Sequence, residues 1–382
     1  MRLRVNLSVV SAVLILSVSA CAGSAVPSSG SASPALQGSN AIAGHSRPAD
    51  TTSILKRLTQ SVVIGSTVDA KNGDKGPRTI SIAPCDHCGS LTKGQLVVCN
   101  FENSSGAAGQ GTTIEALDPK PGSSATRFAQ SNSIEGCDGD AVTSVNEVWG
   151  AGLIARKVLE FNDRGVKKRA YPGKGIVAPF SDADALPKAA FSPEYIFIGT
   201  TSGGLVSISS GFYGDGVATQ VADGFAATKV KGWSTLAPSG LQYDRGLDTL
   251  YIVDGATDTI VAFSHASDLL QKDEIVVQPG GKTFDCEFPK VTCGSLVYSG
   301  SPLAAPVAST LLPNGNLIVA NTQGTANTLV ELTPQGQVLD TKVVDTSRTQ
   351  GVYGLLAVGT NDANTVLFYT DINSNEVIEL EQ

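Results

Sequence analysis

The stretch Gly240–Phe263 constrains the fold more than any other part of the chain. It holds three short apolar runs, Leu241–Tyr243, Leu250–Val253 and Ile260–Phe263, separated by turns rich in Asp, Gly and Thr. Leu, Tyr, Ile, Val and Phe at this density between turn-forming residues are typical of short β-strands that are packed on both faces. Three strands cannot bury both faces of their own meander, so the stretch predicts neighbours of the same kind.

The same pattern recurs along the chain. Short apolar runs that end in a turn-forming residue occur at Gln95–Asn100, Glu194–Gly199, Thr249–Asp254, Asn316–Asn321 and Val366–Asp371. Most of them are followed by a polar turn and a second apolar run. Their spacing is close to the ~40–50 residues of a propeller repeat, and a degenerate copy at Ala141–Phe161 fills the one gap of double length. The pattern therefore predicts six repeat units.

Within the opening stretch and its flank, Pro238–Leu241 (PSGL), Leu250–Asp254 and Ile260 resemble the blade pattern of NHL/YncE-type and SMP-30-like β-propellers. This resemblance implies an all-β fold, a six-bladed β-propeller of four-stranded antiparallel sheets around a central channel. The last unit shows only three strands. An N-terminal strand, either Gln60–Ile64 or Thr79–Ala83, is expected to complete it and close the ring. A two-domain β-sandwich is the alternative, because its turn signals have a similar spacing.

The N-terminal region predicts export and a lipid anchor. Arg2 and Arg4 precede the apolar run Val9–Val18, and small residues lead up to Cys21. This order is typical of a signal peptide, and the cysteine after the small residues resembles the lipobox of bacterial lipoproteins. The resemblance implies a lipoprotein signal peptide at residues 1–20 and a lipid on Cys21, which would hold the protein at a membrane. An ordinary secretory signal is the alternative.

The predicted location is the bacterial cell envelope, with the protein lipid-anchored. The residues directly after Cys21 lack the aspartate that favours inner-membrane retention, so the outer membrane is expected if the source is Gram-negative. Residues 21–52 are rich in Ser, Ala, Gly and Pro and predict a flexible tether, because they hold almost no large apolar side chain. The propeller domain is expected at residues 53–382.

Beyond Cys21 the chain has an even number of cysteines, which predicts disulfides in an exported protein. These disulfide candidates are Cys85, Cys88, Cys99, Cys137, Cys286 and Cys293. Cys286 and Cys293 form an isolated local pair, expected to staple one loop. The other four are expected to pair among themselves, with their connectivity left open.

The segment Cys85-Asp86-His87-Cys88 allows sharper alternatives. A c-type haem site needs a histidine directly after the second cysteine, where Gly89 stands. A zinc site would need further ligands, which Cys99 or Cys137 could supply, but export favours oxidation. A redox dithiol is expected at a strand-to-helix junction, which the sequence does not predict here. A structural disulfide is therefore favoured.

Catalytic motifs are sparse. The chain has three histidines and no G-x-S-x-G segment, which argues against a Ser-His-Asp hydrolase. The SMP-30 resemblance implies a divalent-cation site with an asparagine ligand, but Ser239 stands in that place. Asp138, Asp140 and Glu147 suggest a calcium loop, yet Thr143 occupies the position where an EF-hand requires glycine.

These observations favour a membrane-anchored, non-catalytic β-propeller that binds a protein, glycan or small ligand at the cell envelope. No cofactor is expected for it. The alternative is a metal-dependent envelope hydrolase or lactonase of the SMP-30-like type, for which Ca²⁺ or Mg²⁺ would be expected. Nucleic acid is not an expected partner, because the chain carries a formal net charge of −8 and lacks a basic patch.

Overall fold

The computed structural model describes residues 49–172, 176, 179–185, 193–210, 216–229, 235–347 and 349–382. The predicted signal peptide, Cys21 and nearly all of the predicted tether lie outside the described residues, so lipidation and location stay predictions. Among the described residues, no helix has the length and apolar content to cross a lipid bilayer.

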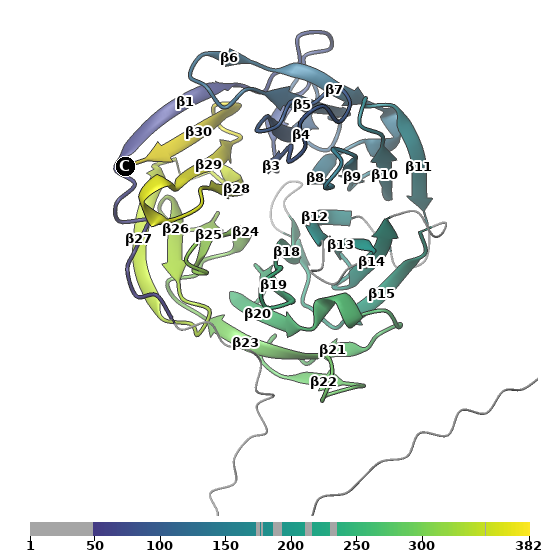
Figure 1. Ribbon diagram of the computed structural model, residues 1–382, viewed down its shortest axis with the longest axis vertical. Coiled ribbons are helices and arrows are strands. Elements are labelled where there is room, and N and C mark those ends of the chain that lie inside the picture. Colours follow the sequence, from purple (N-terminus) through teal and green to yellow (C-terminus); the bar gives the residue numbers. More distant parts are fainter. Residues whose placement is uncertain are drawn as a thin grey trace, which may run out of the picture. The chain divides into compact units, whose positions relative to one another are not determined.

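The described residues form small antiparallel sheets arranged as a propeller, numbered here along the chain (Figure 1). Sheet 1 consists of β2 (Lys75–Pro77), β3 (Ser81–Ile82), β4 (Leu96–Glu102), β5 (Thr113–Leu117) and β7 (Thr126–Gln130). Sheet 2 consists of β8 (Cys137–Val142), β9 (Val148–Gly152), β10 (Lys157–Phe161) and β11 (Lys167–Pro172). Sheet 3 consists of β12 (Pro179–Ala185), β13 (Glu194–Thr200), β14 (Leu205–Ser210) and β15 (Ala218–Asp223), extended by β21 (Ile275–Val277) and β22 (Phe284–Cys286).

The remaining sheets follow the same plan. Sheet 4 consists of β18 (Pro238–Asp244), β19 (Thr249–Asp254), β20 (Thr259–Ser264) and β23 (Cys293–Ser299). Sheet 5 consists of β24 (Pro306–Leu311), β25 (Leu317–Asn321), β26 (Asn327–Leu332) and β27 (Val338–Asp345). Sheet 6 consists of β28 (Val352–Val358), β29 (Val366–Asp371), β30 (Glu376–Glu381) and β1 (Gln60–Ser66), with β6 (Ser123–Ser124) beside β1. The other elements are the pair β16 (Thr228–Lys229) and β17 (Thr235–Leu236) and the 3₁₀ turns η1 (Asn132–Ile134), η2 (Ala266–Asp268) and η3 (Asp362–Asn364).

The predicted all-β propeller of four-stranded antiparallel sheets is confirmed, but the predicted count of six blades needs a correction, and the degenerate repeat expected at Ala141–Phe161 is a regular sheet. Five sheets are regular blades, each with one continuous innermost strand: β8, β12, β18, β24 or β28. In sheet 1 that position is divided between β2 and β3, which pair with different parts of β4. The irregularity falls at Arg78–Ile80, which includes the buried Arg78 described below.

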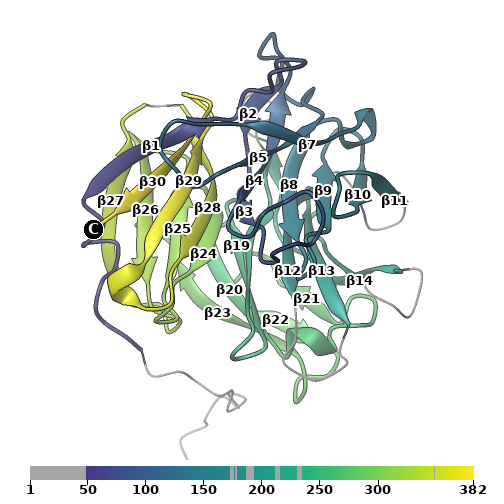
Figure 2. The same ribbon diagram turned by 45° about the horizontal axis from the view of Figure 1, so that its top comes forward.

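The N-terminal strand closes the ring. β1 pairs antiparallel with β30 from Gln60 opposite Glu381 to Ser66 opposite Glu376, so the first and last parts of the chain share one sheet (Figures 1 and 2). Of the two strands expected to do this, Gln60–Ile64 is confirmed. The other candidate, Thr79–Ala83, contributes β3 to sheet 1 instead.

Each pair of neighbouring sheets packs on an apolar cluster of its own. Phe197 of sheet 3 and Phe263 of sheet 4 are both fully buried in one such cluster, and Trp149 lies in the cluster between sheets 2 and 3. Burying a side chain of this size contributes about 1.5–3 kcal/mol. Strands such as those of Gly240–Phe263 carry apolar side chains on both faces. These side chains therefore pack each sheet against its two neighbours.

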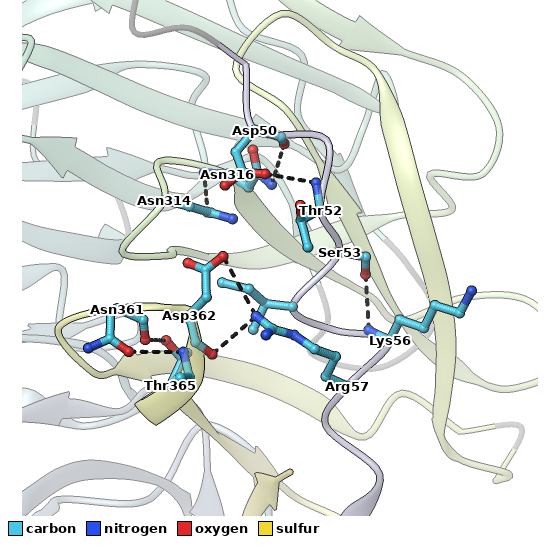
Figure 3. A network of polar contacts seen from close by, with 12 residues as sticks. Asp50, Thr52, Ser53, Lys56, Arg57, Asn314, Asn316, Asn361, Asp362 and Thr365 are labelled. Carbon is cyan, nitrogen blue, oxygen red and sulfur yellow. Dashed lines mark hydrogen bonds and ion pairs between the residues drawn. The ribbon is translucent and has the colours of Figure 1, made fainter.

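A short strap before β1 fastens the N-terminal end to sheets 5 and 6. The buried Glu331 carboxylate accepts hydrogen bonds from the Ile54 and Leu55 backbone N–H groups at 3.2 and 2.8 Å, and from the Ser53 hydroxyl at 2.8 Å. In Figure 3, Arg57 lies beside Asp362 of η3, to whose carbonyl oxygen it donates at 3.1 Å. These contacts fix the position of the chain directly before β1, the strand that closes the ring.

The expected disulfides form. They join Cys85 to Cys88, Cys99 to Cys137, and Cys286 to Cys293. Cys99 and Cys137 are fully buried and link the second strand of sheet 1 to the innermost strand of sheet 2. The isolated local staple predicted for Cys286 and Cys293 is confirmed.

The disulfides should differ in their contribution to stability. Cys99–Cys137 closes a loop with a sequence separation of 38 residues, against 7 for Cys286–Cys293. Replacing Cys99 and Cys137 together by alanine is expected to lower the free energy of unfolding by about 4 kcal/mol, and the same change at Cys286 and Cys293 by about 2.5 kcal/mol, because longer loops constrain the unfolded chain more. Urea denaturation of both double variants measures this difference, and an equal or reversed ranking would contradict it.

Candidate functional site at the channel mouth

The innermost strands of all sheets begin at the same end of the channel, because every sheet starts at its innermost strand. Near each start the pairing with the second strand is interrupted, between Cys137 and Gly139 in β8 and between Val352 and Leu355 in β28, for example. A bulge in a strand re-aims side chains and is common beside functional sites. The residues at these interruptions are therefore the candidates for chemistry at the channel mouth.

Arg78 is the central residue of this region. It lies in the break between β2 and β3, and only 4% of its surface is exposed. Its guanidinium is stacked on two rings, with the Cζ atom 4.2 Å from the Phe101 ring centre and 3.7 Å from that of Tyr353. Its Nε atom lies 3.7 Å from Asp138 Oδ1, and no described group accepts a hydrogen bond from this Nε. The stacking fixes the cation in place and leaves its Nε–H without a described acceptor.

Two carboxyl groups of β8 are buried in this region, and their environments differ: Asp138 lies beside Arg78, whereas Asp140 lies beside Thr79 and Ser81. Burial raises the pKa of Asp138 to about 6, although the Arg78 charge opposes the rise. Burial also raises the pKa of Asp140 to about 6, against the hydroxyl groups of Ser81 and Thr79, which both donate to its carboxylate. No described group donates a hydrogen bond to the Asp138 carboxylate. Asp140 is therefore anchored by two hydroxyl groups, whereas the Asp138 carboxylate has the Arg78 charge as its described partner.

For Asp138 and Asp140 the sequence suggested a calcium loop, but Thr143 at the required glycine position already argued against it. Both residues lie in the strand β8 rather than in a loop, and Glu147 instead pairs with Lys168 at 2.6 Å. Arg78 and Tyr353 were missed as site residues. The signal available for Arg78 was a charged residue next to the short strand Thr79–Ala83, which was expected to close the ring.

The residues at the channel mouth do not fit a divalent cation of the SMP-30 type. Ser239, in place of the expected asparagine, is buried, and no described group bonds its hydroxyl. No three His, Cys, Asp or Glu side chains converge as a metal-binding group anywhere in the described ranges. The Arg78 cation would also repel a second positive charge placed beside Asp138. The positive charge in this region therefore comes from the Arg78 side chain.

The residues that end the second strands hold the loops at this end of the propeller. Asp254 accepts a hydrogen bond from the Ala256 backbone N–H at 2.9 Å, and Asp371 accepts one from that of Asn373 at 2.8 Å. Asn321 instead bonds the loop before β24, accepting from the Ala304 backbone N–H at 3.0 Å. These are hairpin and loop contacts, so they provide no ring of free ligands.

A second buried polar cluster lies between sheets 6 and 1. Arg127 donates to Asp69 through Nε at 2.7 Å and through Nη2 at 2.6 Å. Although burial opposes the shift, these bonds hold the pKa of Asp69 well below its usual range. Burial, together with the neighbouring Asp69 carboxylate, raises the pKa of Glu115 to about 8. Near neutral pH, Glu115 is therefore mostly protonated in the folded protein.

Glu115 should make stability fall with rising pH. Its pKa is about 8 when folded and near 4.5 when unfolded, so between these values only the folded state keeps the proton. The free energy of unfolding should therefore decline from about pH 4.5 to about pH 8 and then level off. Replacing Glu115 by glutamine removes this titration. Between pH 5 and pH 8, the free energy of unfolding should therefore fall less in the variant than in wild type, with a difference on the order of 2 kcal/mol. Urea denaturation at both pH values tests this, with the exposed Glu287→Gln as the control; equal pH slopes in wild type and the Glu115 variant would contradict it.

A cavity of about 150 Å³ lies at the rim, between β1 and β27. Its lining includes Thr59, Lys342 and Tyr369. Its lining brings no cation together with a carboxyl group. We therefore place the candidate site at the channel mouth.

Comparison with known proteins gives the fold and no family. No protein-family model matches the chain, and no curated protein matches it. A gluconolactonase from Xanthomonas campestris matches in structure with a TM-score of 0.53 at 12% identity, over 85% of this chain and 90% of that one. A second protein assigned as a gluconolactonase matches with a TM-score of 0.51 at 12% identity, over 84% and 91% of the two chains. A protein of unknown function from Bacteroides thetaiotaomicron matches with a TM-score of 0.51 at 11% identity, over 84% and 75%. At such identities the similarity shows the propeller fold alone.

Proposed function

We propose that the protein is a hydrolase that opens small cyclic esters at the channel mouth, using Asp138 and Arg78. The observation that carries the proposal is the pairing of a fixed, buried guanidinium with a carboxyl group whose pKa burial raises to about 6. Perturbed carboxyl groups beside a specific charge are a recurring feature of active sites. The alternative function expected from the sequence is a metal-dependent hydrolase or lactonase. Here Arg78 takes the role of the positive charge that the metal would have supplied.

The two residues have complementary tasks in ester hydrolysis. Asp138, when ionised, takes a proton from a water molecule as that water attacks the ester carbonyl carbon. Negative charge then develops on the carbonyl oxygen, and the Arg78 guanidinium stabilises it. A carboxyl group with a pKa of about 6 is largely ionised at pH 7 and remains a stronger base than an ordinary aspartate.

The substrate class is a small lactone, for two reasons. The rings of Phe101 and Tyr353 flank the Arg78 guanidinium within 4.2 Å, so we assign it a small substrate. Two of the proteins with the same fold are described as gluconolactonases, which makes sugar lactones the first compounds to test. A lipid on Cys21 would place this activity at a membrane of the cell envelope, and that location is part of the proposal.

A non-catalytic binding function is the second candidate. One observation favours it: Arg78 is only 4% exposed and already has Asp138 and two rings around it, so the cluster could simply hold sheets 6, 1 and 2 together. The ligand, a protein, glycan or small molecule, would then bind the loops at this end of the propeller.

Assaying the full chain against γ- and δ-lactones of sugars and of simple hydroxy acids separates the two candidates. Acid release followed at constant pH should show turnover above the uncatalysed rate for at least one lactone, and the turnover should survive a strong chelator. Turnover that is lost on chelation would assign the activity to a bound metal and contradict the role of Arg78. Absence of turnover throughout the panel would leave the binding function.

A further inference from the structure

The segment Cys85–Cys88 forms an exposed loop at the other end of the channel. It lies between β3 and β4, where an innermost strand ends, and therefore opposite the Arg78 cluster. Cys85 and Cys88 are half-buried, whereas 94% of the His87 side chain is exposed. Neither cysteine belongs to a strand, so no sheet hydrogen bonds fix their backbone.

One buried side chain holds this loop instead. Asn146, in the turn between β8 and β9, donates to the carbonyl oxygens of Cys85 and Cys88 at 2.9 and 3.2 Å. Its own side-chain oxygen accepts from the Cys85 backbone N–H at 3.0 Å. These bonds involve only backbone groups of the loop, so they survive when the disulfide opens. The two sulfur atoms would then stay close enough to rejoin.

The other two disulfides lack this combination. Cys99 and Cys137 are fully buried and out of reach of a solvent thiol. Cys286 pairs with Ile275 in one sheet, and Cys293 pairs with Ser264 in another, so strand pairing holds both cysteines. Exposure and a neighbouring cation are the features that make a disulfide labile. The loop between Cys286 and Cys293 is exposed as well, but of the three disulfides only Cys85–Cys88 has both cysteines outside a strand and a histidine between them.

We propose that Cys85–Cys88 is an exchangeable disulfide that reacts reversibly with low-molecular-weight thiols. A small thiolate attacks Cys85 Sγ, the sulfur–sulfur bond to Cys88 breaks, and Cys88 leaves as a thiolate. A second small thiolate then attacks the outer sulfur of the mixed disulfide, which releases the small-molecule disulfide and the Cys85 thiolate. Two thiols are thus oxidised by two electrons in total while the protein disulfide becomes a dithiol, and each protein thiolate takes a proton from water.

The residue that tunes this exchange is His87. It directly precedes the leaving Cys88, its Nε2 lies 3.8 Å from Asp86 Oδ2, and it is the histidine that a cysteine pair of this kind uses to favour the thiolate. His87 has a backbone φ of 62°, in the left-handed region that asparagine also tolerates. The His87→Asn variant therefore removes the imidazole while keeping the loop conformation, and it serves as a matched test.

The test uses the full chain equilibrated in glutathione buffers of increasing reducing strength. Acid trapping, alkylation and peptide mass spectrometry give the reduced fraction of each cysteine pair. Cys85–Cys88 is expected to reach half reduction at a [GSH]²/[GSSG] ratio at least about tenfold lower than Cys286–Cys293, while Cys99–Cys137 stays oxidised. A Cys85–Cys88 pair that needs equal or stronger reduction than Cys286–Cys293 is a structural staple, and that result would overturn the proposal.

Two variants test the mechanism apart from the equilibrium. His87→Asn should slow the reaction with glutathione by about threefold or more. Asn146→Gly keeps the left-handed backbone at φ 62° but removes the side-chain hydrogen bonds to the backbone of Cys85 and Cys88. This variant should therefore re-form the disulfide more slowly after reduction. Unchanged rates in both variants would show that loop exposure alone governs the chemistry and would refute the assigned roles of His87 and Asn146.

Discussion

Replacing Asp138 by asparagine is expected to lower kcat/KM for lactone hydrolysis by about 100-fold or more, within the range that a positioned general base contributes. Asparagine keeps the size and shape of the side chain but cannot take a proton from the attacking water. Steady-state kinetics at pH 7 on the lactone that turns over fastest measures the loss.

Asp140→Asn is the matched control for this prediction. Both aspartates lie on β8, and burial raises the pKa of each to about 6. Because Thr79 and Ser81 already donate to the Asp140 carboxylate, we expect its replacement to reduce kcat/KM by less than about tenfold. If the Asp140 variant loses activity and the Asp138 variant keeps it, the assignment of the base is wrong.

Replacing Arg78 by methionine is expected to lower the free energy of unfolding by about 3–5 kcal/mol, because Asp138 would be left as a buried carboxyl group without its cation. Methionine retains much of the apolar contact with Phe101 and Tyr353. Denaturation in urea measures the change, and the double variant Arg78→Met with Asp138→Asn should recover part of it.

The control for the arginine is Arg57→Met. Arg57 pairs with Asp362 at 3.6 Å, but its side chain is 37% exposed. Exposed pairs contribute about 0–1 kcal/mol, so this change should be small. Equal losses at Arg57 and Arg78 would contradict the view that the Arg78 pair is an energetically important buried contact.

The fold could be predicted because its determinants are local. The apolar runs and polar turns of Gly240–Phe263 repeat along the chain, and each repeat must pack on its neighbours. The same reasoning identified Gln60–Ile64 as a candidate closing strand. It could not foresee that Thr79–Ala83 would form half of a divided innermost strand, because the break depends on the packing of Arg78 between two rings.

The site was harder to predict, because it joins residues that are distant in the sequence. Arg78, Asp138 and Tyr353 meet only when sheets 6, 1 and 2 lie side by side. Their spacing in the chain resembles no motif. Ser239 stands where the asparagine ligand was expected, which argued against a metal site of the SMP-30 type, but nothing at that position pointed to Arg78.

The most direct test of the proposed hydrolase is the pH dependence of kcat/KM for lactone hydrolysis by the full chain in the presence of a chelator. The rate should rise from pH 4.5, pass an inflection near pH 6 as Asp138 ionises, and level off by pH 8. Turnover that vanishes with the chelator, or a rate that does not change across this interval, would contradict catalysis by Asp138 and Arg78.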